Sequence, residues 1–367
     1  MNTQVAVLVS SAVCALLLPV HTTVSAGGAP AARPRHAVRV LVVTDMEGIS
    51  GINDPRMTDN SPRYVSYYDR GREHLHDDVN ACIAGLFDGG ATAVDVVDGH
   101  GSGHNLEASR IDPRARLLSQ DTRRDLYFTL PREGTYDAVL TVGMHDKPLG
   151  GGFMAHTRGA GLSPVLNGAT LTETELLAYE FGMTDVPVIF ASGDDRLQRD
   201  LAESLPWIVY VTVKRATGYS TAELSHPDTT RAALRAGARL AVESLSRMKS
   251  LKPTTPIRAG MLATFPQQLP PPGSPFSRLP EIEYRGDTIT FPARDYPEAY
   301  ERMGFLMNFA VRGGSQFILG LLRARPEAAS AFEAVYDSVF DRLLPAFEAG
   351  TWRPGMVPPP PVKNPPH

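Results

Sequence analysis

The chain has 367 residues, of which 43% are hydrophobic and 21% are charged, and its formal net charge at pH 7 is -4. This composition is typical of a soluble globular protein, and the length allows one large domain or two ordinary ones. The small negative charge excludes a basic surface that would attract nucleic acid.

The first 26 residues differ from the rest of the chain. They contain no Asp, Glu, Lys or Arg, and residues 5–20 are mostly apolar. The segment VSA at residues 24–26 then offers the small residues that signal peptidase prefers. We predict that residues 1–26 are a secretory signal peptide and residues 27–37 a linker, and that the mature protein is secreted or periplasmic. An uncleaved membrane anchor is the alternative, but the apolar run is shorter than the about 20 residues that a spanning helix needs.

The chain has two cysteines, and one of them, Cys14, lies inside the predicted signal peptide. The mature protein therefore keeps only Cys82, which excludes an intramolecular disulfide. Val13 stands where a lipoprotein signal has a small residue, so we expect export without lipid attachment and no stable association with the membrane. Cys82 lies on the apolar side of a predicted helix, which indicates a core residue rather than a nucleophile.

Strands and helices alternate over residues 38–214. A helix with apolar residues at three- and four-residue steps ends at Gly89-Gly90, and another is expected to begin at Thr172. Asn167-Gly168 lies between two apolar segments, which predicts a β-hairpin. Apolar runs predict strands at residues 37–43, 92–98, 137–144 and 186–191. This alternation is typical of a three-layer α/β fold, with a mainly parallel sheet and helices on both faces.

After Lys214 the pattern changes. A long helix is expected at about residues 229–248, followed by a Pro-rich loop at 269–275, a strand at 288–292 and a helix near 299–310. We predict that residues 38–214 are the metal-binding catalytic domain, and that residues 215–350 form a smaller α+β domain with a C-terminal helical extension. Residues 351–367 are rich in proline and are expected to be a disordered tail.

Acidic and histidine side chains follow three of the predicted strands. Asp45 and Glu47 follow the first strand, Asp98 and His100 the second, and His145 the third. Open α/β sheets bind ligands at the carboxyl ends of their strands, and these side chains supply the oxygen and nitrogen ligands of zinc. Two carboxylates tolerate each other in an apolar segment when a cation lies between them. We therefore predict a metal site at this edge of the sheet.

Each side chain also has a simpler explanation. An Asp-x-Glu after a strand is usually a turn with a helix cap, and His100 and His104 could be solvated loop residues. His145 could be a hydrogen-bonded core histidine, and His156 could be any loop histidine. Glu173 near a helix start is favoured by the helix dipole. The metal site is favoured because three successive strands direct such groups to one edge.

Three further aspartates receive predictions of their own. We expect Asp98 to orient a metal ligand such as His100, because outer carboxylates commonly hold ligating histidines. Asp194 and Asp195 follow a strand and precede a helix, so they are expected to cap that helix.

Eight short segments stand in a characteristic order along the chain. They are TDMEGISGI (44–52), YYDRGREHLHDDVNACI (67–83), VVDGH (96–100), VGMH (142–145), MAH (154–156), LNGATLTETELLAY (166–179), ASGDDR (191–196) and VTVKRATG (211–218). With these segments the sequence resembles the DppA-type D-aminopeptidases, a family of binuclear zinc peptidases, over about residues 38–310. One difference is that Asp98-Gly99-His100 stands where the family has Asp-Ser-His.

The resemblance implies two zinc ions (Zn2+) per subunit. Asp45 would bridge them, Glu47 and His100 would complete one site, and the other site would be completed by His145 and Glu173. His156 matches the family's catalytic histidine, as a nucleophile or a proton-transfer group.

The resemblance implies a metallo-aminopeptidase that hydrolyses short peptides such as D-Ala-D-Ala, with a zinc-activated water or the histidine as the attacking group, and the predicted signal peptide adds that the enzyme is exported. It also implies a ring-type homo-oligomer, for which a decamer is the expected state, with active sites facing an inner channel. A related metal-dependent amidase or an L-aminopeptidase would use the same ligands. A non-enzymatic exported solute-binding protein is a third alternative, and it explains neither the side-chain cluster nor the family match.

Overall fold

A computed structural model of the chain describes residues 37–101, 103–118, 136–158, 162–264, 269, 281–304 and 306–307. The predicted signal peptide, the C-terminal helical extension and the Pro-rich tail lie outside the described residues, as do most of the linker and most of the Pro-rich loop. Within the described ranges, no helix is both long enough and apolar enough to cross a membrane.

The larger of two sheets has seven strands in the order β3-β2-β1-β4-β7-β8-β9. Neighbouring strands are parallel except β8 and β9, which are antiparallel. The strands span Arg39–Thr44 (β1), Ala93–Asp98 (β2), Ala115–Leu117 (β3), Ala138–Val142 (β4), Val188–Asp194 (β7), Val209–Gly218 (β8) and Thr221–Leu224 (β9). Strands β1, β4 and β7 are almost wholly buried, which explains why their sequences are mostly apolar. All four predicted strands are confirmed, with ends shifted by a few residues.

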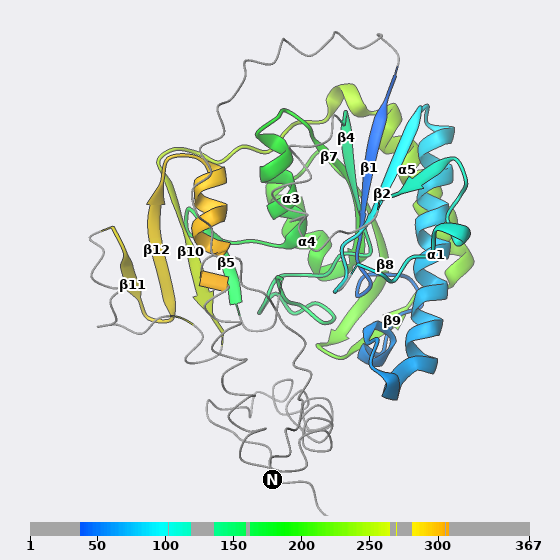
Figure 1. The fold of residues 1–367 in the computed structure, drawn as a ribbon, viewed down its shortest axis with the longest axis horizontal. Helices are drawn as coiled ribbons and strands as arrows, with labels where there is room; N and C mark the ends of the chain where they lie inside the picture. Colours follow the sequence, from blue (N-terminus) through cyan, green and yellow to red (C-terminus); the bar gives the residue numbers. More distant parts are fainter. Residues whose placement is uncertain are drawn as a thin grey trace, which may run out of the picture. The chain divides into compact units, whose positions relative to one another are not determined.

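Helices cover both faces of this sheet. The helices α1 (Val65–Asp88) and α5 (Pro227–Glu243) pack against each other and share an apolar cluster with one face. The helices α3 (Glu173–Gly182) and α4 (Asp195–Ser204) share a second cluster with the other face. Figure 1 shows α3 to the left of the sheet, and α1 and α5 to its right. The predicted three-layer α/β fold is therefore confirmed.

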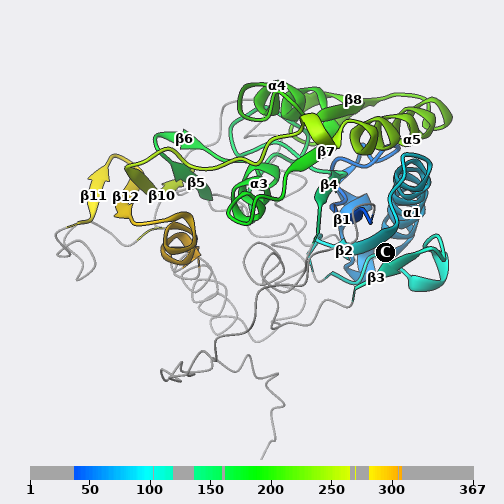
Figure 2. The ribbon, with the colours of Figure 1, turned by 90° about the horizontal axis from the view of Figure 1, so that it is seen from above.

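A smaller sheet has five antiparallel strands in the order β11-β12-β10-β5-β6. Residues 296–304 are helical, and four of their side chains join the cluster that contains α3. Figure 2 shows α3 between the two sheets. The strands span Leu162–Leu166 (β5), Ala169–Thr170 (β6), Ile257–Ala263 (β10), Glu283–Arg285 (β11) and Thr288–Ala293 (β12). Single 3-10 turns occur at Pro55–Thr58 (η1), Pro62–Tyr64 (η2), Ala108–Arg110 (η3) and Leu245–Arg247 (η4).

The predicted hairpin is confirmed at Asn167 and Gly168, which join β5 to β6 with φ values of 49° and 90°. Two consecutive positive φ values are what a tight two-residue hairpin turn requires. This hairpin belongs to the smaller sheet, although its residues lie within the predicted 38–214 domain. Strand β8 continues through residue 214, and α5 packs against α1 on the larger sheet. Elements from both sides of the predicted boundary between residues 214 and 215 therefore take part in both sheets.

Candidate metal centre

The six predicted site residues gather at the carboxyl end of the larger sheet. Their potential ligand atoms form two groups, each with all its ligand atoms within 4.8 Å of one another. We call them the Glu47 group (Asp45, Glu47 and His100) and the Glu173 group (His145, His156 and Glu173). The prediction that these side chains come together is confirmed, whereas their individual roles stay predictions.

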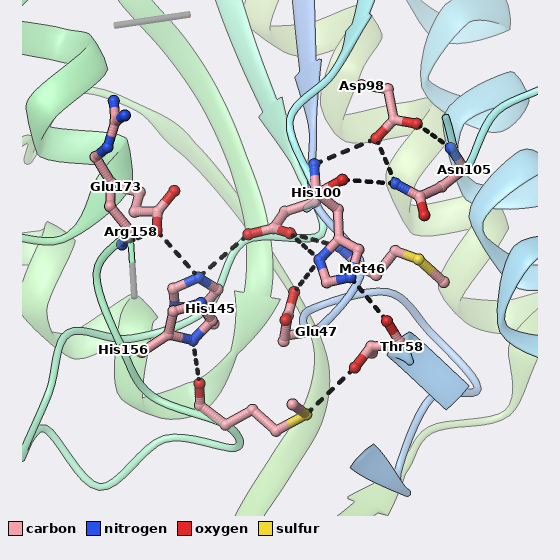
Figure 3. Close-up of polar contacts among 12 residues, drawn as sticks. Met46, Glu47, Thr58, Asp98, His100, Asn105, His145, His156, Arg158 and Glu173 are labelled. Carbon is pink, nitrogen blue, oxygen red and sulfur yellow. Dashed lines mark hydrogen bonds and ion pairs between the residues drawn. The ribbon is translucent and has the colours of Figure 1, made fainter. Parts of the chain in front are cut away.

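In the Glu47 group, the His100 ring lies between two carboxylates and a backbone carbonyl (Figure 3). Its Nδ1 lies 3.0 Å from Asp45 Oδ1 and 3.1 Å from Glu47 Oε2. Its Nε2 lies 2.8 Å from the carbonyl oxygen of Thr58. A carbonyl only accepts, so Nε2 carries the hydrogen and Nδ1 is the nitrogen that faces the carboxylates. A histidine held this way by an outer carbonyl is typical of a metal ligand.

In the Glu173 group, the His145 Nε2 lies 3.2 Å from Asp45 Oδ2 and 3.6 Å from Glu173 Oε1. These are ion-pair distances, but among the described residues this buried nitrogen has no partner with the geometry of a hydrogen bond. The other ring nitrogen, Nδ1, lies 2.9 Å from the carbonyl oxygen of Asp146. Asp45 thus directs one carboxylate oxygen to His100 and the other to His145, which is the arrangement of a carboxylate shared by two cations.

His156 stacks on His145, with ring centroids 3.9 Å apart and an interplanar angle of 13°. Its Nδ1 lies 2.7 Å from the carbonyl oxygen of Met154, which leaves Nε2 for other contacts. Met154 and Arg158 have φ values of 50° and 54°, a region that non-glycine residues rarely adopt. The Arg158 N–H donates to Glu173 Oε1 at 2.5 Å. Strained backbone therefore holds both a ring and a carboxylate of this group.

Buried negative charge dominates the electrostatics. Burial alone would lower the pKa of both ligand histidines, but the Glu47 and Asp45 carboxylates outweigh it and raise the pKa of His100 well above its usual value. Asp45 and Glu173 do the same for the pKa of His145. Burial and the nearby charge of Glu47 raise the pKa of Asp45. Burial would also raise the pKa of Glu47, yet the His100 charge lowers it well below the usual range.

These side chains fit two metal ions. The donors are imidazole nitrogens and carboxylate oxygens, the set that suits zinc. Within the part of the chain that the structure describes, the buried His145 Nε2 lacks a hydrogen-bond partner, and buried polar atoms without one are rare in folded proteins. A cation between the ring nitrogens and the carboxylates would satisfy that atom and neutralise the buried charge.

Asp98 supports the loop that carries His100. It accepts hydrogen bonds from the backbone N–H groups of His100 at 3.2 Å, Asn105 at 2.5 Å and Leu106 at 3.0 Å, and from the Asn105 side chain at 2.9 Å. Its contact with His100 is thus made through the backbone, which differs from the expected contact with a ligand side chain. His104, in the same loop, is exposed, in agreement with its simpler explanation.

Asp194 caps α4, as predicted, by accepting from the N–H groups of Arg196 and Leu197 through Oδ1. Its Oδ2 also accepts from the Phe153 N–H at 2.7 Å, in the loop that leads to His156. Sequence reasoning missed this second contact, and it missed the buried Lys214 on β8. The only available signal for Lys214 was a charged residue that interrupts a strand beside apolar neighbours.

Comparison with known proteins places the chain. The family model of the D-aminopeptidases (Peptidase_M55) matches residues 38–305, more than half of the chain. The chain belongs to the D-aminopeptidase family. This membership confirms the resemblance seen in the sequence and the predicted enzyme class, a metallopeptidase.

Two relatives illustrate how far the likeness to D-aminopeptidases extends. A curated D-aminopeptidase of Bacillus subtilis (strain 168) is 29% identical over 282 residues, which cover 75% of this chain and 98% of that protein. A solved structure, described as the Zn-dependent D-aminopeptidase DppA from Bacillus subtilis, a self-compartmentalizing protease, matches with a TM-score of 0.66 and 28% identity. That match also covers 75% of this chain and 98% of the other.

Proposed function

We propose that this chain is an exported, zinc-dependent aminopeptidase that removes the N-terminal residue from short peptides of D-amino acids, such as D-Ala-D-Ala. The observation that carries the metal part of this proposal is the shared carboxylate of Asp45, which faces a ring nitrogen in each group. Membership of the D-aminopeptidase family supports the peptidase part. The zinc dependence of the Bacillus subtilis structure supports the choice of metal.

Asp45, Glu47 and His100 would hold one zinc ion, and Asp45, His145 and Glu173 the other. Bound zinc supplies a Lewis acid and lowers the pKa of a bound water towards about 7. The second ion would bind the free N-terminal amine of the substrate or polarise the scissile carbonyl.

His156 is the group that moves a proton or attacks the peptide in this proposal. The Met154 carbonyl occupies Nδ1, so Nε2 is the nitrogen available for chemistry. Stacking on His145 fixes the plane of the His156 ring within the Glu173 group. This arrangement orients Nε2 without requiring His156 to bind a metal.

Two parts of the proposal concern the cell and the assembly. Export to the periplasm or the medium is supported by the uncharged, apolar segment at residues 1–26. A homo-oligomer is supported by the description of the Bacillus subtilis relative as self-compartmentalizing, and the sequence resemblance makes a ring of ten subunits the expected state. Its active sites would then face an inner space that admits only short peptides.

The test is hydrolysis of D-Ala-D-Ala and of L-Ala-L-Ala by the purified mature chain, with bound metal quantified by mass spectrometry on the same sample. Two metals per chain with D-selective cleavage is the expected result. Two metals with L-selective cleavage, or with amidase activity alone, would keep the site and replace the substrate. A chain that binds no metal after reconstitution with zinc would overturn the proposal.

A further inference from the structure

A lysine lies buried beneath the Glu47 group. Lys214, on β8, is 1% exposed, and its Nζ donates to the carbonyl oxygens of Glu47 at 2.6 Å and Ile52 at 2.5 Å. The same Nζ lies 4.9 Å from the centre of the Phe153 ring. Both carbonyls belong to the turn over residues 47–52 that follows β1. One buried amino group, whose pKa burial lowers to about 7, therefore joins the two ends of the turn that carries Glu47.

The chemistry of this contact is specific to an amine. Burying an ammonium group costs free energy unless its donors are used, and Lys214 uses two of them on backbone carbonyls. A methionine of similar length would fill the same space without that cost, but it has no N–H to donate. The benefit of lysine at this position is therefore the fixed geometry of the turn rather than the packing of β8.

A buried carboxyl group also holds this turn, by accepting hydrogen bonds from donor groups of the turn. Asp78, on α1, is 1% exposed, and its two oxygens accept from the Ser50 N–H at 2.7 Å and the Ser50 hydroxyl at 2.5 Å. Gly48 also presses against the backbone after β4, because an added Cβ would lie 1.9 Å from the Met144 carbonyl oxygen. The turn is thus held through its carbonyls by the Lys214 amino group, through Ser50 by the Asp78 carboxyl group, and at Gly48 by close backbone contact.

The Glu173 group is supported by other contacts. His145 is oriented by the Asp146 carbonyl, and Glu173 is held by the Arg158 N–H. The Glu47 group depends on the turn directly, because the carbonyl that Lys214 binds belongs to Glu47 itself. Loss of the lysine should therefore affect one group much more than the other.

We propose that Lys214 is a positioning residue, which fixes the Glu47 backbone so that the Glu47 carboxylate meets His100 and the metal ion held there. This inference rests on the proposed function. The lysine does not touch the substrate, and it acts only through the turn.

The test compares Lys214→Met with the wild-type chain in a competition titration against a zinc chelator, which resolves the two metal affinities. We expect the affinity for one metal to fall about 10- to 100-fold, as for other outer partners of metal ligands, while the second affinity stays within about threefold. The variant Lys214→Gln has an amide N–H that can donate, so it should lower the affinity for the same metal to a smaller extent. Hydrogen exchange of the segment 45–52 should become faster in Lys214→Met.

The matched control is Leu234→Ala, which removes a fully buried side chain of α5 in the cluster under the same face of the sheet. It should lower the melting temperature without changing either metal affinity. Equal losses at both metals in Lys214→Met, or wild-type affinities at both, would overturn the positioning role.

A wild-type chain that binds no zinc would refute the proposed function instead. Hydrogen exchange would still decide the inference in that case, because it reports on the turn without metal. The segment 45–52 must then exchange faster in Lys214→Met than in Leu234→Ala, and equal exchange would overturn the role of Lys214.

Discussion

The Glu47 group and the Glu173 group meet at one carboxylate but are built from different parts of the chain. The residues of the Glu47 group directly follow β1 and β2, which are neighbouring parallel strands paired up to Thr44 and Asp98. The Glu173 group joins a residue after β4 to the first residue of α3 and to a loop that leads into the smaller sheet. The first group is thus fixed by the register of one sheet, whereas the second needs three separate segments in place.

The supporting contacts follow the same division. The Glu47 group is held by buried side chains, namely Lys214, Asp78 and Asp98, that bind the backbone of its two loops. The Glu173 group is held mainly by backbone groups, such as the Arg158 N–H and the Met154 carbonyl. Side-chain substitutions can therefore test the support of the first group separately, whereas the support of the second depends on loop conformation.

The largest effect is expected when Asp45 is removed, because its carboxylate faces a histidine of each group. Asp45→Ala should lower the affinity for both metals by more than about 100-fold and abolish peptidase activity. This loss exceeds the roughly 10- to 100-fold that is typical when an outer partner of a metal ligand is removed. The measurement is metal content and chelator competition on the purified variant. Asp112→Ala is the control, because Asp112 pairs with Arg114 and belongs to neither group. Retention of one metal at wild-type affinity would mean that the two groups do not share Asp45.

The next effect shows whether His156 acts in catalysis or binds a metal. The second role is considered because His156 lies within ligand distance of the other residues in the Glu173 group. His156→Gln should keep both metals and lower kcat by about 10²- to 10⁴-fold, the usual contribution of a proton-transfer residue. Metal content and kcat are measured on the same preparation. The exposed His104 gives the control, since His104→Gln should change neither value. Loss of one metal in His156→Gln would make this histidine a ligand, and wild-type kcat would remove it from the reaction.

The difference between the groups also explains what the sequence could predict. Residues of the Glu47 group follow strands with clear apolar runs, and a parallel sheet brings the ends of such strands to one edge. His145 is predicted in the same way. Glu173 and His156 carry no such signal, because Glu173 stands at the start of a well-capped helix and His156 lies in a loop. Only the family resemblance assigned them to the site.

The fold shows the same limit. The long strands and the hairpin at Asn167-Gly168 follow from local patterns, whereas β3 has only three residues and gives no periodicity. The sequence changes character at Lys214, but β8 continues through it, and the smaller sheet pairs β5 with β10 across about 100 residues of chain. Pairing over such distances leaves no local signal. The buried state of Lys214 depends on that tertiary arrangement as well.

The smallest expected effect is the pH dependence of metal binding. In this effect the two groups should behave alike. Without metal, the carboxylates raise the pKa of His100 and His145 well above the usual value. A raised folded-state pKa stabilises the fold fully below the unfolded value of about 6.5, and this contribution is lost as the pH rises through the folded-state pKa. A metal needs the same nitrogens without their protons, so its apparent affinity should rise with pH by at most about tenfold per unit for each proton displaced.

The stability of the protein reports this competition directly. Between about pH 6 and pH 8, the metal-free chain loses the histidine contribution while zinc binds more tightly, so the melting temperatures of the zinc-loaded and metal-free chains should move apart. Thermal unfolding with and without zinc across this range measures the difference. In His100→Gln, zinc displaces a proton from only one of the two histidines, so the difference between the two melting temperatures should widen less with pH. In Glu173→Gln both histidines remain, so the widening should be better preserved. A gap that narrows with rising pH would show that protons and metal do not compete for His100 and His145, and neither group could then be the metal site.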